Sequence, residues 1–175
     1  HLISGGTRTL KVLFALAKGA WILKPSYLYA AVENQKLPSE KDYTHSDVFP
    51  GICKAGAGPL TLYEYAKACL TFYFVSLKGQ KLLHRQKVFV APNQEEPPRK
   101  ILIKLLHLCG ATIVRTFERA QICIGPEDFR PPESSTVQVV SPKWLFESLQ
   151  SYSVAEFNLH VWPWQKAATR EAIPL

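Results

Sequence analysis

Two cations near the start of the chain, Arg8 and Lys11, have the types and spacing of an anion-binding site. The start of a helix carries unpaired N–H groups and about half a positive charge, so cations there are unfavourable and an anion is favoured. The alternative is a solvated basic face that tolerates a cost of about 0.3–1 kcal/mol. A helix over residues 8–18 is predicted by apolar residues with the spacing of a buried stripe: Leu10, Leu13, Phe14 and Ala17.

The charge of the chain is unevenly spread. The 175 residues carry a net charge of +7. Residues 1–90 hold 12 Lys and Arg against 5 Asp and Glu, whereas residues 91–175 hold nine of each. The basic half favours acidic partners such as phosphopeptides or nucleic acid, and the charge alone does not choose between them.

The four cysteines carry no metal or redox motif. No C-x-x-C pair occurs, and no histidine completes a zinc-finger spacing. The apolar run over residues 68–77 is too short to span a membrane, and no secretory leader opens the chain. We therefore expect an intracellular protein with reduced thiols, no metal, no cofactor and no membrane contact.

The elements that position Arg8 and Lys11 occur twice in the chain. Residues 21–28 match residues 138–145 at an offset of 117, and residues 2–5 match residues 122–125 at an offset of 120. Each copy contains two short β-rich runs, and the second run leads through a proline into an apolar helix. We expect equivalent buried residues on the two helices: Tyr27, Leu28, Ala31 and Val32 in the first, and Trp144, Leu145, Ser148 and Leu149 in the second.

The two copies differ in what else they contain. The second also has an earlier strand over 88–90, an amphipathic helix over 100–108 that stops at Gly110, and a strand over 111–114. Its residues 129–135 include two consecutive prolines and cannot be helical. We therefore expect the second copy to lack the basic helix, and the first copy to begin inside its repeat.

This order of elements predicts an α/β fold with two repeats, each a short parallel sheet flanked by helices. Residues 1–36 form the end of the first repeat, 37–86 a long connector, 87–164 the second repeat and 165–175 a tail. Within the connector, residues 60–77 are rich in Leu, Tyr and Phe, which predicts a packed helical linker after a mobile Gly-rich loop.

The pattern resembles the BRCT family, the phosphopeptide-recognition repeats of DNA-damage-response proteins, in its tandem arrangement. The resemblance covers nearly the whole chain except the connector and the last dozen residues. It is carried by Arg8-Thr9-Leu10-Lys11, Gly19 with Trp21-Ile22, Leu108-Cys109-Gly110-Ala111, and Ser141-Pro142-Lys143-Trp144 with Ser148.

The resemblance implies roles for particular residues. Lys11, with Thr9, contacts the phosphate, and Arg8 bonds the peptide backbone near the third residue after the phosphorylated one. Leu13 walls an apolar specificity pocket opposite Glu96 and Pro97. The family also uses a Ser or Thr and a Gly from the first strand and its loop, which the first copy does not contain, so the site is half built. The structural core residues are Gly19, Trp21, Gly110 and Trp144.

Three classes of function follow. The first is a phosphopeptide-binding adaptor in DNA-damage signalling, repair or cell-cycle checkpoint control. Its partners are phosphorylated protein tails or peptides, with chromatin or DNA reached indirectly and no small-molecule substrate. The resemblance places it in the nucleus, with the centrosome or cytoplasm as further compartments. The second is a phosphate-independent interaction or DNA-binding module.

The third class is an accessory domain of a larger enzyme. The segment has no Gly-rich phosphate loop, metal cluster or nucleophile elbow, so we expect no catalysis in it. Trp162-Pro163-Trp164 after the last helix leaves two alternatives open: both indoles pad the end of the domain, or they form an exposed surface for a partner.

Overall fold

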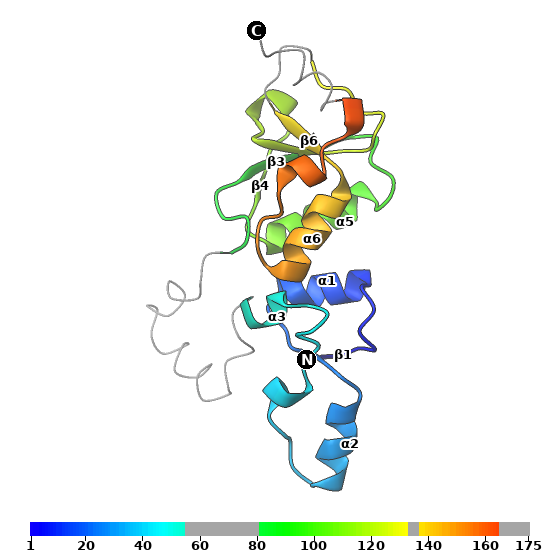
Figure 1. The fold of residues 1–175 in the computed structure, drawn as a ribbon. Coiled ribbons are helices and arrows are strands. Elements are labelled where there is room, and N and C mark those ends of the chain that lie inside the picture. Colours follow the sequence, from blue (N-terminus) through cyan, green and yellow to red (C-terminus); the bar gives the residue numbers. More distant parts are fainter. Residues whose placement is uncertain (55–80, 133–136, 165–175) are drawn as a thin grey trace, which may run out of the picture. The chain divides into compact units, whose positions relative to one another are not determined.

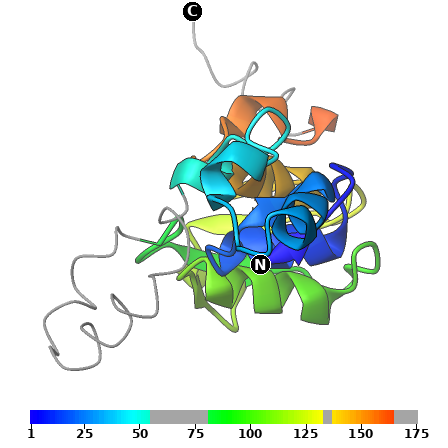
Figure 2. The ribbon, with the colours of Figure 1, turned by 90° about the horizontal axis from the view of Figure 1, so that it is seen from below.

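The computed structural model describes residues 1–54, 81–132 and 137–164, which are drawn in colour in Figures 1 and 2. The chain divides into two compact units. The first contains residues 1–82 together with 149–153, and the second contains 83–148 together with 154–175. The expected helical linker over 60–77, the Gly-rich loop before it and the tail over 165–175 lie outside the described residues.

The first unit is built on a two-stranded parallel sheet. Leu2 pairs with Ile22 and Ile3 with Leu23, so the connection between the strands crosses over through a helix. Both strands are apolar, and Ile22 and Leu23 are fully buried. The elements are β1 (Leu2–Ile3), α1 (Leu10–Ala17), β2 (Ile22–Leu23), α2 (Ser26–Glu33), a 3-10 turn η1 (Glu40–Tyr43) and α3 (Gly51–Lys54).

Helix α1 begins two residues later than its apolar pattern predicts. Thr9 is the N-cap, with extended backbone, and its Oγ1 accepts a hydrogen bond from the Val12 N–H at 3.4 Å. Arg8 therefore precedes the helix, and only Lys11 lies in the first turn. The predicted stripe is wrong at Leu10, which is the first residue of the helix and is 38% exposed, whereas Val12 and Leu16 are buried beside Leu13.

Helix α2 buries little of its expected apolar face. Tyr27 is buried and packs edge to face on Tyr43, but Leu28 is 51% and Val32 79% exposed. The prediction of a buried stripe is therefore wrong for this helix. The physical reason is the size of the sheet: the described part of the first unit offers two short strands to pack on.

The second unit is a four-stranded parallel sheet in the order β4-β3-β5-β6. This parallel α/β architecture confirms the predicted fold class. Its elements are β3 (Lys87–Val90), α5 (Arg99–Leu108), β4 (Thr112–Ile113), η3 (Phe117–Arg119), β5 (Ile122–Ile124), β6 (Gln138–Val140), α6 (Pro142–Ser151) and η4 (Phe157–Leu159).

The register of this sheet separates two faces. Phe89, Cys123 and Val139 are paired side by side, so they share one face, and their strand neighbours share the other. Figure 1 shows α5 and α6 together on one side of the sheet. The opposite face carries an aromatic cluster, which we define as Phe89, Phe117, Phe129, Trp162 and Trp164 around Cys123 and Val139.

Equivalent hydrogen bonds relate the two units. The Lys24 N–H donates to Tyr43 O at 2.8 Å, and the Ser141 N–H donates to His160 O at 3.0 Å, both at the offset of 117. The repeat therefore continues through η1, beyond α2.

The equivalent strands β1 and β5 correspond at an offset that is one residue larger than the offset read in the sequence. The Ser4 N–H donates to Leu23 O, and the Gly125 N–H donates to Val140 O. Leu23 and Val140 correspond at the offset of 117, so Ser4 corresponds to Gly125. This gives an offset of 121, because the glycine that suggested 120 occupies the next position of the loop in the first copy.

No helix among the described residues is long and apolar enough to cross a membrane.

Candidate anion-binding site

The first unit brings Arg8, Thr9 and Lys11 together at the start of α1. All three are exposed, and the first turn of the helix has no acidic residue. The Val12 N–H is taken up by Thr9 Oγ1 and the Leu13 N–H by Thr9 O at 3.0 Å. The N–H groups of the first two helical residues are left for a ligand or for water. Free N–H groups beside a lysine are able to accept an anion, so the chemistry of this helix start is compatible with the predicted site.

A buried histidine holds the loop that leads into this helix. His45 is 8% exposed, and its Nε2 lies 2.8 Å from Ser4 O, so Nε2 carries the proton and donates it to the carbonyl. Gly6 has φ +89°, and a Cβ there would lie 3.1 Å from His45 Cε1. Only glycine fits both the backbone conformation and the space beside the ring. We call this arrangement the His45 clasp; sequence reasoning missed it, because nothing in the local pattern links residues 4 and 45.

Arg8 is held from a different element. Its Nη1 donates to Gln150 Oε1 at 3.1 Å, and Gln150 Nε2 donates to Val48 O at 3.0 Å. Gln150 lies in the last turn of α6. This turn is part of residues 149–153, which belong to the first unit, whereas the rest of α6 belongs to the second. The bond to Gln150 orients the Arg8 side chain. Because a guanidinium has five N–H donors, others remain for a ligand.

The other residues that the resemblance implies are placed as follows. Leu13 lies on α1 and is 3% exposed, whereas Glu96 is exposed and Pro97 half-buried in the second unit. The specificity pocket that joins them therefore stays a prediction. Gly19 and Gly110 follow α1 and α5 with φ of +69° and +86°. Trp21 and Trp144 are buried.

The second unit has an equivalent loop with the opposite charge. Trp162 occupies the position of His45, and its Nε1–H donates to Gly125 O at 3.1 Å, as His45 does to Ser4 O. We call this the Trp162 clasp. The next residues along the loop include Glu127 and Asp128, both exposed, where the first unit has Gly6 and Thr7. The described residues 125–132 form no helix, as their prolines predict.

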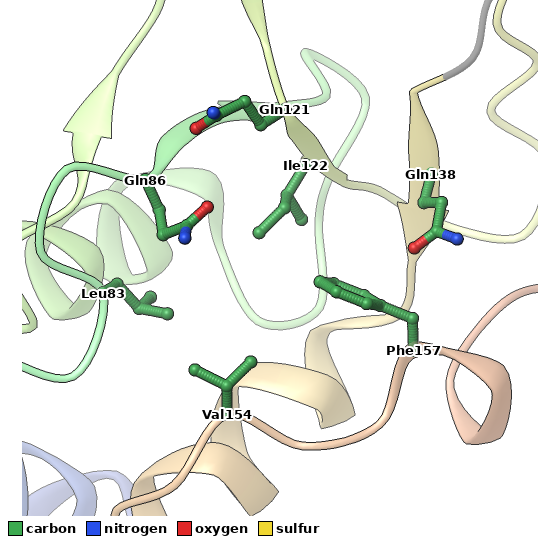
Figure 3. Close-up of a pocket in the computed structure, with 7 residues that line it drawn as sticks. All are labelled: Leu83, Gln86, Gln121, Ile122, Gln138, Val154 and Phe157. Carbon is green, nitrogen blue, oxygen red and sulfur yellow. The ribbon is translucent and has the colours of Figure 1, made fainter.

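The second unit also has a cavity of about 350 Å³ at the amino ends of β3, β5 and β6 (Figure 3). Its polar groups are the neutral amides of Gln86, Gln121 and Gln138, and Gln121 Oε1 already accepts the Lys87 N–H at 2.8 Å. None of its lining residues is titratable, so it offers no acid–base chemistry. Among the described residues, no group of three or more His, Cys, Asp or Glu could hold a metal ion.

No family model matches the chain. Microcephalin from Mus musculus is 28% identical over 157 residues, which cover 90% of this chain and 17% of that protein. Microcephalin from Homo sapiens is 29% identical over 161 residues, which cover 88% and 17%. The chain spans about a sixth of the length of these relatives.

Among solved structures, the BRCT5-BRCT6 domains of S. pombe Brc1 match with a TM-score of 0.51 and 16% identity, covering 90% of this chain and 80% of that one. The chain has the tandem BRCT fold and resembles microcephalin. In the second copy the sequence carries this resemblance at residues 107–110 and 120–126.

Proposed function

We propose that this chain is a protein-interaction module of the DNA-damage response that binds phosphoserine or phosphothreonine peptides at the start of α1. The observation that supports it most directly is the meeting of Lys11 with the unpaired N–H groups of a helix whose first turn has no acid. The likeness to microcephalin and the tandem BRCT fold support the same class of function. The module acts as a nuclear adaptor and not as an enzyme.

The chemistry of the site favours a phosphate over a carboxylate. A phosphoserine carries a charge of about −1.5 to −2 at neutral pH and three acceptor oxygens. Lys11 supplies a charged donor, the helix start supplies backbone N–H groups, and the Thr9 hydroxyl retains its proton as a donor because its oxygen is the acceptor for Val12. Each hydrogen bond to a charged group contributes about 1.5–3 kcal/mol.

Arg8 has a separate role in this proposal. It precedes the helix, whereas Lys11 lies in the first helical turn, and its Nη1 donates a hydrogen bond to Gln150 Oε1. As the resemblance to the BRCT family implies, Arg8 bonds the peptide backbone near the third residue after the phosphoresidue.

The test measures phosphate discrimination by the chain. Paired peptides of the form Ser-x-x-hydrophobic, with and without phosphate, are titrated by calorimetry. Lys11→Met is expected to weaken binding of the phosphorylated peptide by about 10- to 100-fold and to leave the unphosphorylated peptide unchanged. Lys18→Met is the matched control, because Lys18 is an exposed cation at the other end of α1. Equal affinity for the two peptides contradicts the proposal.

A second candidate is a phosphate-independent or DNA-binding module, which the basic charge of the first half favours. It predicts a steep fall in DNA affinity with salt, because bound lysines and arginines release counterions from the DNA. It also predicts that Lys11→Met and Lys18→Met weaken DNA binding to the same small degree. Specific loss with Lys11→Met alone, and only for the phosphopeptide, separates the adaptor from this alternative.

A further inference from the structure

We propose that a second site, at the carboxyl ends of β3 and β5, binds the lysine or arginine side chain of a basic peptide from a partner protein. The structure has a cavity of about 470 Å³ there, within the second unit. Its walls come from the β3–α5 loop, the connection after β5, the start of α6 and the Trp162 segment. The lining residues are Asn93, Gln94, Glu95, Glu96, Pro126, Glu127, Asp128, Pro142 and Trp162.

The charge of this cavity is strongly negative. Four carboxylates line it, two from each of the two loops, and all four residues are exposed. None of the four forms a salt bridge with a residue that the structure describes. Asp128 is steadied at 3.4 Å by the Asn93 amide, which is a neutral donor. A cationic ligand would neutralise charge that the described part of the protein leaves unpaired.

A buried acceptor in the wall indicates that the ligand carries N–H donors. Gln94 is 5% exposed, and its Nε2 donates to Glu96 O at 2.7 Å and to Pro97 O at 3.3 Å. These bonds fix the orientation of the amide, and its Oε1 has no hydrogen-bond partner among the residues that the structure describes. A buried oxygen without a partner destabilises the protein, and an ammonium or guanidinium donor that bonded to it would remove that penalty.

The apolar walls suit the stem and head of a long cationic side chain. Pro126, Pro142 and the Trp162 ring line the cavity, and the Trp162 N–H is already used on Gly125 O. An indole face attracts a cation. The neighbouring Arg130 makes this contact within the unit: its guanidinium lies 4.5 Å from the Trp164 ring centroid and donates to Glu127 O. A second guanidinium or ammonium would meet a similar combination of indole and oxygen.

Two other uses of the carboxylates are weaker. A metal ion needs closely grouped ligands, and no such group occurs among the described residues. The carboxylates also lie near the amino ends of α5 and α6, where they stabilise the helix dipoles. The nearby cations Arg99 and Lys143 do not line the cavity, and Arg99 Nε donates to Val90 O at 3.1 Å. Helix stabilisation alone leaves the Gln94 acceptor unexplained.

The experiment uses two unphosphorylated probe peptides with a single lysine or arginine among Gly and Ala, and their acetyl-lysine or citrulline counterparts. Binding is followed on the Trp162 indole resonance by NMR. The charged peptides are expected to bind at least about 10-fold more tightly than the neutral ones. The double variant Glu127→Gln and Asp128→Asn should remove this difference, and Glu118→Gln, an exposed acid outside the cavity, should not.

The outcomes separate this site from the anion site and from the other uses. Lys11→Met must leave basic-peptide binding unchanged, so failure of the phosphopeptide proposal does not decide this one. Equal binding of charged and neutral peptides overturns the inference. So does a response of the indole resonance to calcium alone that a chelator reverses. A loss of thermal stability in the double variant with peptide binding intact would leave the carboxylates as helix-stabilising groups only.

Discussion

The connections that follow β1 and β5 begin at equivalent residues and cover their sheets in different ways. After β1 the chain forms α1, which packs against β2. After β5 no helix occurs over residues 125–132, and aromatic side chains around Cys123 and Val139 cover the sheet instead. The helix presents backbone N–H groups and the Lys11 side chain. The loop after β5 instead exposes the carboxylates of Glu127 and Asp128.

The backbone position of the loop after the strand and the charge of that loop are determined by different residues. In each unit a ring N–H donates to the carbonyl that follows a strand: His45, from the segment after α2, bonds Ser4 O, and Trp162, from the segment after α6, bonds Gly125 O. On that fixed backbone the first unit carries Arg8, whereas the second carries Glu127 and Asp128 together with Arg130. If both proposals hold, the choice of ligand depends on a few loop residues and not on the fold.

The largest expected effect concerns the two equivalent helices α6 and α2. Leu145 is fully buried, whereas Leu28, its counterpart, is 51% exposed. Leu145→Ala should cost about 2–5 kcal/mol of unfolding free energy, because it removes packed methyl groups and leaves a cavity. Leu28→Ala should cost less than about 1 kcal/mol. Urea unfolding of both variants checks this, and equal losses would mean that the face of α2 is buried in solution.

The next effect tests the space beside the His45 ring. Gly6→Ala forces a side chain into φ +89° and against His45, so it should cost about 1–3 kcal/mol and weaken phosphopeptide binding. Gly5→Ala is the matched control, because a Cβ at Gly5 would meet nothing within 4 Å. Denaturant midpoints and peptide affinities are measured together. A Gly6→Ala variant with full stability would rule out the close approach of the ring.

A smaller effect separates the two clasps. His45→Leu removes the hydrogen bond to Ser4 O and should cost about 1 kcal/mol, with a loss of phosphopeptide affinity, because the loop before α1 is no longer fixed. Trp162→Phe removes the bond to Gly125 O at a similar cost, with phosphopeptide affinity unchanged. His45→Gln keeps a donor and should restore part of the affinity. If both clasp variants reduce affinity equally, the effect is on general stability.

The smallest effect reports on the aromatic cover. Burial raises the pKa of Cys123 from 9.0 to about 12, so its thiol stays protonated at pH 8 and should react slowly with a thiol reagent, whereas exposed Cys53 should react at once. The unfolded thiol ionises near its ordinary value, so this contribution to stability is complete below pH 9 and is lost as the pH rises toward 12. Mass spectrometry of the labelled native protein identifies the modified cysteine, and rapid labelling of Cys123 would show that the cover opens.

Much of the fold follows from periodicity and repetition. Strands β3 and β4 with the helix α5 between them, and strand β6 before Pro142, were predictable because burial imposes the apolar pattern that the sequence shows. The start of α1 was not, because the Thr9 cap competes with a plausible turn at Arg8. The exposure of Leu28 and Val32 depends on what packs against α2, which a single sequence does not specify.

The candidate sites divide in the same way. Lys11 and Arg8 could be found because two cations at a helix start oppose the dipole locally. His45 and Gln150 could not be found in this way, because their hydrogen-bond partners Ser4 and Arg8 are separated from them by 41 and 142 positions in the sequence. The acidic cavity was missed for the same reason: its carboxylates come from two loops that only the parallel sheet brings together.

The His45 clasp also sets an order of events during synthesis. Ser4 and His45 are 41 residues apart, and the ring comes from the segment after α2. A ribosome must therefore release the chain from Ser4 to at least His45 before the loop at residues 4–8 can be fastened. The loop that carries Arg8 thus leaves the ribosome before the ring that holds it in place.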